Sequence, residues 1–190
     1  MEAFLVSLGV VAIGEIGDKT QLLALMLSAR FRRPVPIILG IFCATLLNHA
    51  VAGALGGWIR SLLNPDVLRW GLGASFLAVA AWALVPDKMD EGRQTKANTG
   101  LGIFAITVST FFLAEIGDKT QIATMMLAAR FNDLVPVVAG TTVGMLLADV
   151  PAVLFAQIAA PKIPFKAIRI VAASLFAVIG LAALLGHGTG

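Results

Sequence analysis

One heptapeptide, Glu-Ile-Gly-Asp-Lys-Thr-Gln, occurs twice in this chain, at residues 15–21 and 115–121. Each copy lies within a long apolar segment, where it introduces two carboxylates, one ammonium and one carboxamide. Ionisable groups at membrane depth are costly and mark the pathway of an ion or a proton. An unchanged duplication therefore predicts that the two copies form the two halves of one binding site.

The composition indicates a membrane protein. Of the 190 residues, 58% are hydrophobic and 13% are charged, which is about half the charged fraction of a soluble domain. Six apolar runs reach the roughly 20 residues that a helix needs to cross a hydrocarbon core of about 30 Å. Because backbone groups in lipid must be hydrogen-bonded within their own segment, these runs are predicted to be helices. The expected fold class is an all-α integral membrane protein with six transmembrane helices.

The two copies of the heptapeptide belong to a longer internal repeat with a constant offset of 100 positions. Matching pairs include Arg30 and Arg130, Gly40 and Gly140, and Phe76 and Phe176. Repeat 1 spans residues 1–86, with helices predicted at about 3–28, 34–59 and 67–86. Repeat 2 spans residues 101–190, with helices predicted at about 101–128, 134–159 and 166–186, and residues 87–100 form the connecting loop. Since each repeat has an odd number of helices, the second is inverted relative to the first, as in many secondary transporters.

The basic residues predict the orientation in the membrane. Arginine and lysine concentrate near residues 29–34, 86–100 and 161–166, which all lie at one end of the predicted bundle. By the positive-inside rule, this end faces the cytoplasm. We therefore expect a multi-pass protein of the inner (plasma) membrane, with both termini outside and the 87–100 loop in the cytoplasm.

The side chains of the heptapeptide are oxygen ligands. On one continuous helix, Glu15, Asp18 and Gln21 share a face, because they are three residues apart. Gly17 lies between the two acids, where the absence of a side chain permits close helix packing or local unwinding. Such oxygens suit Mn²⁺, Ca²⁺ and Mg²⁺ better than Cu(I) or Zn²⁺. The predicted metal ligands are Glu15, Asp18, Gln21, Glu115, Asp118 and Gln121, and the predicted accessory or proton-coupling residues are Lys19, Thr20, Asn48, Lys119, Thr120 and Asp149.

The charges of the two copies sum to minus two, which one divalent cation would neutralise. Without a cation, four clustered carboxylates could not all stay ionised in a medium of low dielectric, so some would take up protons. Metal and protons would then compete for the same oxygens, which is the physical basis of metal/proton antiport. This mechanism is a hypothesis drawn from the residue types.

The second predicted helix of each repeat adds polar residues at midspan, where Asn48 and His49 align with Ala148 and Asp149. Asp149 could complete the metal site, carry a proton or make a structural hydrogen bond. His49 is interpreted as a packed or hydrogen-bonded histidine more readily than as a ligand. The one cysteine, Cys43, excludes a disulfide within the chain and is interpreted as a small buried hydrophobic residue.

Two copies of Glu-x-Gly-Asp-Lys/Arg-Thr/Ser in a six-helix inverted repeat resemble the GDT family of cation/H⁺ exchangers. That family includes eukaryotic Golgi manganese/calcium transporters and bacterial manganese exporters. The resemblance covers essentially the whole chain and implies exchange of Mn²⁺ or Ca²⁺ for H⁺, with no cofactor beyond the transported ion. It assigns the site to the motif acids Glu15, Asp18, Glu115 and Asp118. Without a long acidic central loop, the chain is similar to the compact bacterial members.

Several alternatives stay open. Within transport, they are a Ca²⁺/H⁺ exchanger, an exporter of a small organic cation, and coupling to Na⁺ in place of H⁺. A membrane enzyme would need a nucleophile–base pair or a cluster of Cys or His, which two distant histidines do not supply. A structural membrane protein that transports nothing is the third class. The expected partners are the lipid bilayer, divalent metal ions and protons, without nucleic acid, and a homodimer is left open.

Overall fold

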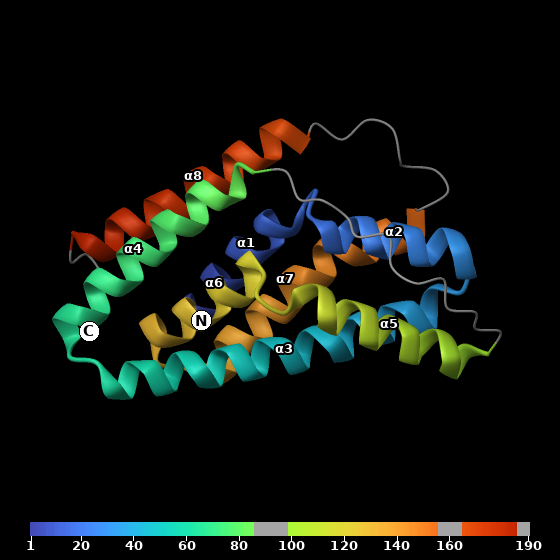
Figure 1. The fold of residues 1–190 in the computed structure, drawn as a ribbon, viewed down its shortest axis with the longest axis horizontal. Coiled ribbons are helices and arrows are strands. Elements are labelled where there is room, and N and C mark those ends of the chain that lie inside the picture. Colours follow the sequence, from blue (N-terminus) through green and yellow to red (C-terminus); the bar gives the residue numbers. More distant parts are fainter. Residues whose placement is uncertain (86–98, 156–164, 186–190) are drawn as a thin grey trace.

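The computed structural model describes residues 1–85, 99–155 and 165–185, and within these ranges the chain is helical, without strands. Eight helices are described, and Figure 1 shows α4 and α8 side by side, with α3 along the opposite side. Their bounds are α1 Glu2–Glu15, α2 Lys19–Phe31, α3 Pro34–Leu62, α4 Pro65–Ala83, α5 Gly100–Glu115, α6 Lys119–Phe131, α7 Leu134–Phe155 and α8 Phe165–Leu184.

The motif-bearing helices are broken, each within its heptapeptide. The sequence predicted continuous helices over about 3–28 and 101–128. Instead the first helix stops at Glu15 and a new one begins at Lys19, and the second stops at Glu115 and a new one begins at Lys119. The glycines at the breaks, Gly17 and Gly117, have φ angles of 81° and 74°, a region that L residues with a Cβ avoid. The face predicted from a continuous helix is therefore wrong, and the unwinding permitted by glycine is what occurs.

Two of the described helices, α3 and α7, are long and apolar enough to cross a membrane. The pair α5 and α6, bent by 71° at its break, would be a third span if the two halves are counted as one. Apolar side chains are exposed along α3, including Leu39 and Leu55, as expected for a surface that faces lipid. Cys43 is also exposed on α3, so its interpretation as a buried residue is wrong. The structure supports an all-α membrane protein.

Helices at equivalent places in the two repeats pack in equivalent ways. α1 lies against α7, and α5 lies against α3. In both contacts a glycine lets the backbones approach. A Cβ at Gly40 would lie 2.6 Å from Cβ of Thr107 on α5, and one at Gly140 would clash with the Phe4 carbonyl on α1. α4 and α8, the last helices of the two repeats, pack against each other.

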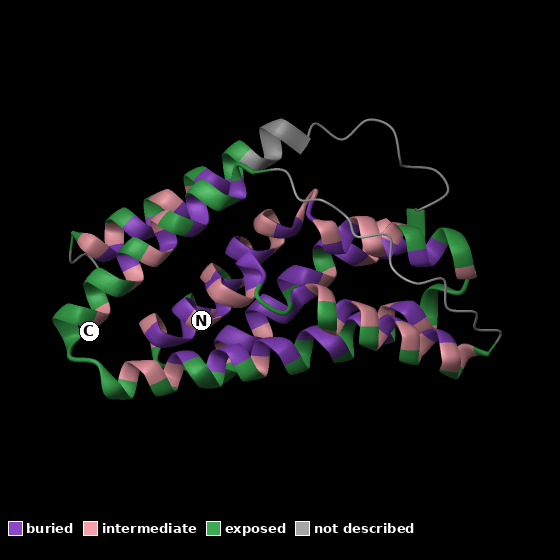
Figure 2. Ribbon diagram, in the orientation of Figure 1, coloured by how far each residue is buried: buried purple, intermediate pink, exposed green. Residues whose placement is uncertain are grey.

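The buried apolar residues form two clusters, and Figure 2 colours all buried residues purple along the helices. The first joins α1, α4, α6 and α8 with Val137 of α7, and includes the fully buried Phe76 and the buried Phe176. The second joins α2, α3, α5 and α7, and includes Ile41 and Phe111. The α4–α8 pair therefore packs with α1 and α6 but, among the described residues, shares no cluster with α2 and α5, the other halves of the two broken helices.

Candidate cation site

The two helix breaks place the motifs against each other, and their lysines and aspartates pair across the repeats. Lys119 Nζ donates a hydrogen bond of 2.6 Å to Asp18 Oδ1. In the reciprocal pair, Lys19 Nζ lies 3.4 Å from Asp118 Oδ2. Both aspartates and Lys119 are buried, while 28% of the Lys19 side chain is exposed. Each motif therefore supplies the countercharge of the other.

Three of the four motif acids lie close enough together to bind one metal ion. Glu15, Asp18 and Asp118 each contribute a carboxylate oxygen, and these oxygens lie within 4.8 Å of one another. All three residues are buried. Glu115 is buried as well but lies outside this group, where its Oε1 accepts a 3.0 Å hydrogen bond from Thr45 of α3. The structure thus brings together three of the predicted acid ligands and places the fourth beside them.

The same motif adopts different local structures in the two repeats. Thr20 Oγ1 donates a 2.5 Å hydrogen bond to Glu15 Oε2, whereas Thr120 Oγ1 has no hydrogen-bond partner among the described residues. Asp118 Oδ1 accepts from the backbone amide of Lys119 and caps α6, and the Asp18 side chain does not cap α2. Because the sequences are identical, these differences report the different surroundings of the two copies.

The two glutamines fasten the helix breaks. The Gly17 amide donates to Gln21 Oε1, and the Gly117 amide donates to Gln121 Oε1, both at 2.8 Å. The Gln21 side-chain amide then donates to the Ala148 carbonyl of α7, and that of Gln121 donates to Asn48 Oδ1 of α3. The oxygens predicted as metal ligands are thus engaged by the backbone in this structure, and the amides tie each break to the other repeat.

Two polar residues near the middle of α3 and α7, Asn48 and Asp149, interact with the motifs. Asp149 is fully buried, interacts electrostatically with Glu15 and Glu115, and neither of its oxygens has a hydrogen-bond partner in the described part of the chain. His49 is also buried, and neither of its ring nitrogens has such a partner among the described residues. Asn48 donates to the Phe112 carbonyl and accepts from Gln121.

Sequence reasoning missed Thr45, the residue that donates to Glu115. Its counterpart in the second repeat is Met145, so the repeat gives no signal at this position. The available signal was its spacing, since Thr45 lies three residues before Asn48 and shares its helix face.

The cluster has more acids than bases and little free space. Five buried carboxyl groups, of Glu15, Asp18, Glu115, Asp118 and Asp149, lie near two ammonium groups. Buried charge without compensation is unfavourable, so such a site favours entry of a cation or of protons. The cavity beside Asp18 has a volume of about 10 Å³, roughly the space of one water molecule, which suits a bare ion better than an organic cation.

A protein-family model confirms what this geometry suggests. The model for "Divalent cation/proton antiporter GDT1" matches residues 3–91 and 103–190, once for each repeat. The chain belongs to this family of antiporters. The resemblance drawn from the duplicated motif is thereby confirmed, and the protein is a transporter, not an enzyme. A divalent cation and protons are the species that GDT1 antiporters exchange.

Named relatives of this GDT1 antiporter come from bacteria and plants. A Vibrio cholerae protein, named "Putative manganese exporter", is 50% identical over 96% of this chain and 90% of its own length. A GDT1-like protein of Synechocystis is 28% identical over 93% of each chain. GDT1-like protein 5 of Arabidopsis thaliana is 26% identical over 97% of this chain and 96% of its own length. No solved structure matches the chain at a significant level.

Proposed function

We propose that this antiporter exports Mn²⁺ across the inner (plasma) membrane in exchange for entering protons. The choice of metal is supported by the relative from Vibrio cholerae, whose name refers to manganese. It is also supported by the all-oxygen donor set of Glu15, Asp18 and Asp118, which suits Mn²⁺ better than softer metals. Calcium accepts the same donors, so Ca²⁺/H⁺ exchange is the second candidate.

The observation that carries the proposal is the crossed pairing of lysine and aspartate between the repeats. An ammonium 2.6 Å from Asp18 Oδ1 stands where a metal ion would be bound. Divalent cations bind oxygens at about 2.0–2.6 Å, so oxygens on opposite sides of one ion lie about 4–5 Å apart. The 4.8 Å spread of the three acid oxygens therefore fits a single ion without a change in the backbone. We infer that Mn²⁺ binds there and that Lys119 leaves Asp18 as it does so.

The remaining predicted residues take supporting roles in this proposal. Glu115 is the fourth acid and would join the ion by leaving Thr45. Gln21 and Gln121 could ligate only by sharing or releasing the amides of the two glycines, so their main role is to stabilise the breaks.

Thr20 orients Glu15, and its counterpart Thr120 would do the same for Glu115 when the repeats exchange conformations. When the ion leaves, protons take its place on the carboxyl groups, including that of Asp149 on α7. The Asn48 carboxamide takes up no proton and serves as a hydrogen-bonding neighbour of the second motif.

The proposed architecture is six membrane spans in two inverted repeats. α1 with α2 and α5 with α6 each form one broken span, and α3, α4, α7 and α8 form the other four. The matching torsions at the breaks and the equivalent packing of α1 on α7 and of α5 on α3 support this arrangement. Broken helices that meet near the midplane are typical of secondary transporters. In the proposed topology both termini lie outside, and residues 87–100 lie in the cytoplasm.

The position of the α4–α8 pair supports a specific form of alternating access. α4 packs against α6, and α8 packs against α1. If the two repeats exchanged conformations, the α4–α6 contact would be replaced by an α8–α2 contact, and the α8–α1 contact by an α4–α5 contact. Both of these are at most slight between the described residues of this structure. We infer that the α4–α8 pair moves between the two arrangements. In the proposed topology α1 and α6 form the outer half, so we infer that packing of the α4–α8 pair on them corresponds to the state closed to the outside.

Flux measurements test the function. The full chain is reconstituted in proteoliposomes, and Mn²⁺ uptake is followed under an imposed pH gradient, with Ca²⁺ and Mg²⁺ as competitors. We expect gradient-dependent Mn²⁺ flux that is lost in Asp18→Asn and kept in Asp66→Asn, which removes an exposed carboxylate outside the site. Flux of Ca²⁺ alone would favour the second candidate. No flux of either metal in folded protein would overturn the proposal.

A further inference from the structure

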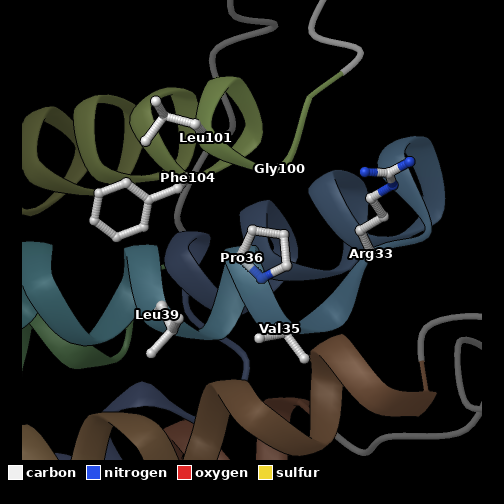
Figure 3. Close-up of a pocket in the computed structure, with 7 residues that line it drawn as sticks. All are labelled: Arg33, Val35, Pro36, Leu39, Gly100, Leu101 and Phe104. Carbon is white, nitrogen blue, oxygen red and sulfur yellow. The ribbon is translucent and has the colours of Figure 1, made fainter.

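A groove lies at one end of the molecule, between the first turns of α3 and α5 (Figure 3). Its volume is about 340 Å³, within the range of ligand-binding pockets. The side chains that line it are apolar apart from Arg33, and Leu39 and Leu101 are 51% and 77% exposed. Figure 3 shows Arg33 at one end of the groove, with Leu39 and Phe104 at the other. The groove is thus apolar along most of its length and has a cationic side chain, that of Arg33, at one end.

The charge of that end has no countercharge in the described structure. Arg33 is exposed and forms no hydrogen bond or ion pair with a described residue. Arg32 beside it is exposed and has a φ angle of 53°, in the left-handed region that Asn tolerates better than Arg. At the same two positions, the second repeat has Asn132 and Asp133. Cationic charge therefore distinguishes this corner from its inverted equivalent.

The start of α5 adds a second preference for anions. The Thr99 hydroxyl accepts the amide of Gly102, and the first amides of a helix have no partner within the helix itself. These amides and the helix dipole attract a phosphate group. Among the described residues, those that line the groove include no acid.

We propose that the groove binds one anionic phospholipid. Its phosphate would lie between Arg33 and the start of α5, and an acyl chain would extend over Leu39 and Phe104. This inference rests on the proposed function in one respect, because the proposed topology places this end at the cytoplasmic leaflet, where basic residues recruit anionic lipid. A zwitterionic headgroup would instead bring an ammonium beside two arginines.

The lipid would sit over the contact between α3 and α5. Below the groove, Gly40 faces Thr107 and the Phe104 carbonyl, so that a Cβ there would be 2.6 Å from the threonine Cβ. α3 and α5 carry Thr45 and Glu115, whose side chains are hydrogen-bonded. An acyl chain across this contact would therefore stabilise the packing that places the fourth acid of the site.

Native mass spectrometry of the purified full chain tests the proposal, with phosphatidylglycerol and phosphatidylcholine of identical acyl chains as probes. We expect one phosphatidylglycerol to be retained in preference to phosphatidylcholine. Arg33→Ala should weaken that retention about fivefold, the effect of one basic residue at an anionic surface, and Arg33→Lys should retain most of it. Asp133→Ala, at the inverted position, is the matched control and should change nothing.

Leu101→Glu gives a second variant that does not depend on the arginine. It places a carboxylate in the groove at an exposed position in the first turn of α5, where an acid stabilises the helix, and it should also lower retention. The proposal would be overturned by equal retention of both lipids, or by unchanged retention in Arg33→Ala and Leu101→Glu. It would also be overturned if the chain were a dimer that retained no lipid, because a second copy could then cover the groove. The assay involves no transport, so a failure of Mn²⁺ flux would leave its result unaffected.

Discussion

Lys119 of one repeat donates a 2.6 Å hydrogen bond to Asp18 of the other, and the two side chains are 6% and 1% exposed. Removing one partner of a buried ion pair is strongly destabilising, because the remaining charge loses its compensation. A divalent cation can supply the same compensation to the aspartate. The pair therefore links the stability of the empty site to the binding of the transported ion.

The first prediction concerns this ammonium group. Lys119→Met should destabilise the metal-free protein by about 3 kcal/mol and increase the stabilisation that Mn²⁺ gives, since the ion no longer displaces an ammonium. Lys19→Met is the matched control, and its effect should be smaller because Lys19 is 28% exposed and 3.4 Å from its partner. Thermal unfolding with and without Mn²⁺ measures both quantities. An unchanged response to Mn²⁺ in Lys119→Met would contradict the displacement.

The second prediction concerns the helix breaks. Gly117→Ala should lower the stability by about 1–2 kcal/mol, because alanine at a φ of 74° is strained. Apart from its chain neighbours, no described residue has an atom within 4 Å of the added Cβ, so the effect is conformational. Gly57→Ala, within the last two turns of α3 and equally uncrowded, should raise the stability by about 0.5–1 kcal/mol. Unfolding measurements that gave both substitutions the same sign would show that the break is not required.

The third prediction concerns Thr45. Thr45→Val removes a hydrogen bond to a buried carboxylate and should cost about 1.5–3 kcal/mol, with weaker Mn²⁺ binding. Thr142→Val is the control, because the buried Thr142 hydroxyl has no hydrogen-bond partner in the described residues, and its removal should be neutral or stabilising. Equilibrium unfolding and Mn²⁺ titration of both variants measure the difference. Equal costs would refute the role assigned to Thr45.

The fourth prediction concerns movement of the α4–α8 pair. A Cβ at Gly14 of α1 would lie 3.6 Å from the ring of Phe176 on α8, and the inverted equivalents of these residues are Ala114 and Phe76. In a background without Cys43, whose exposed thiol would react, cysteine pairs are introduced at 14 with 176 and at 114 with 76. Both pairs should cross-link during transport, and either cross-link should stop flux. Active protein in which the 114–76 pair never reacts would exclude the movement.

The repetition in the sequence predicted which residues meet, but not how they meet. Two identical copies at a constant offset were enough to place Asp18 and Asp118 in one cluster. The break could not be predicted, since Gly17 in an apolar run is compatible both with a continuous helix and with an unwound one. The cross-pairing of Lys19 and Lys119 could not be predicted either. Each lysine is the first residue of the helix after a break, so the break sets the direction of its side chain.

The two halves of the site also differ in ways that a repeat conceals. Glu15 is hydrogen-bonded by Thr20 of its own motif, whereas Glu115 is hydrogen-bonded by Thr45 of α3. Part of that difference is encoded, because the counterpart of Thr45 is Met145, which cannot donate a hydrogen bond to Glu15. The other part is not, because Thr20 and Thr120 belong to identical motifs, yet only Thr20 is hydrogen-bonded to its glutamate among the described residues.

The most direct test of the central claim is the stoichiometry of Mn²⁺ binding. Equilibrium dialysis of the purified full chain, with Mn²⁺ followed by electron paramagnetic resonance, counts the ions bound per chain. Since both motifs form one site, the account predicts one ion per chain and loss of that ion in Asp18→Asn and in Asp118→Asn alike. Two ions per chain, each lost in only one of the two variants, would show two separate sites and contradict the account.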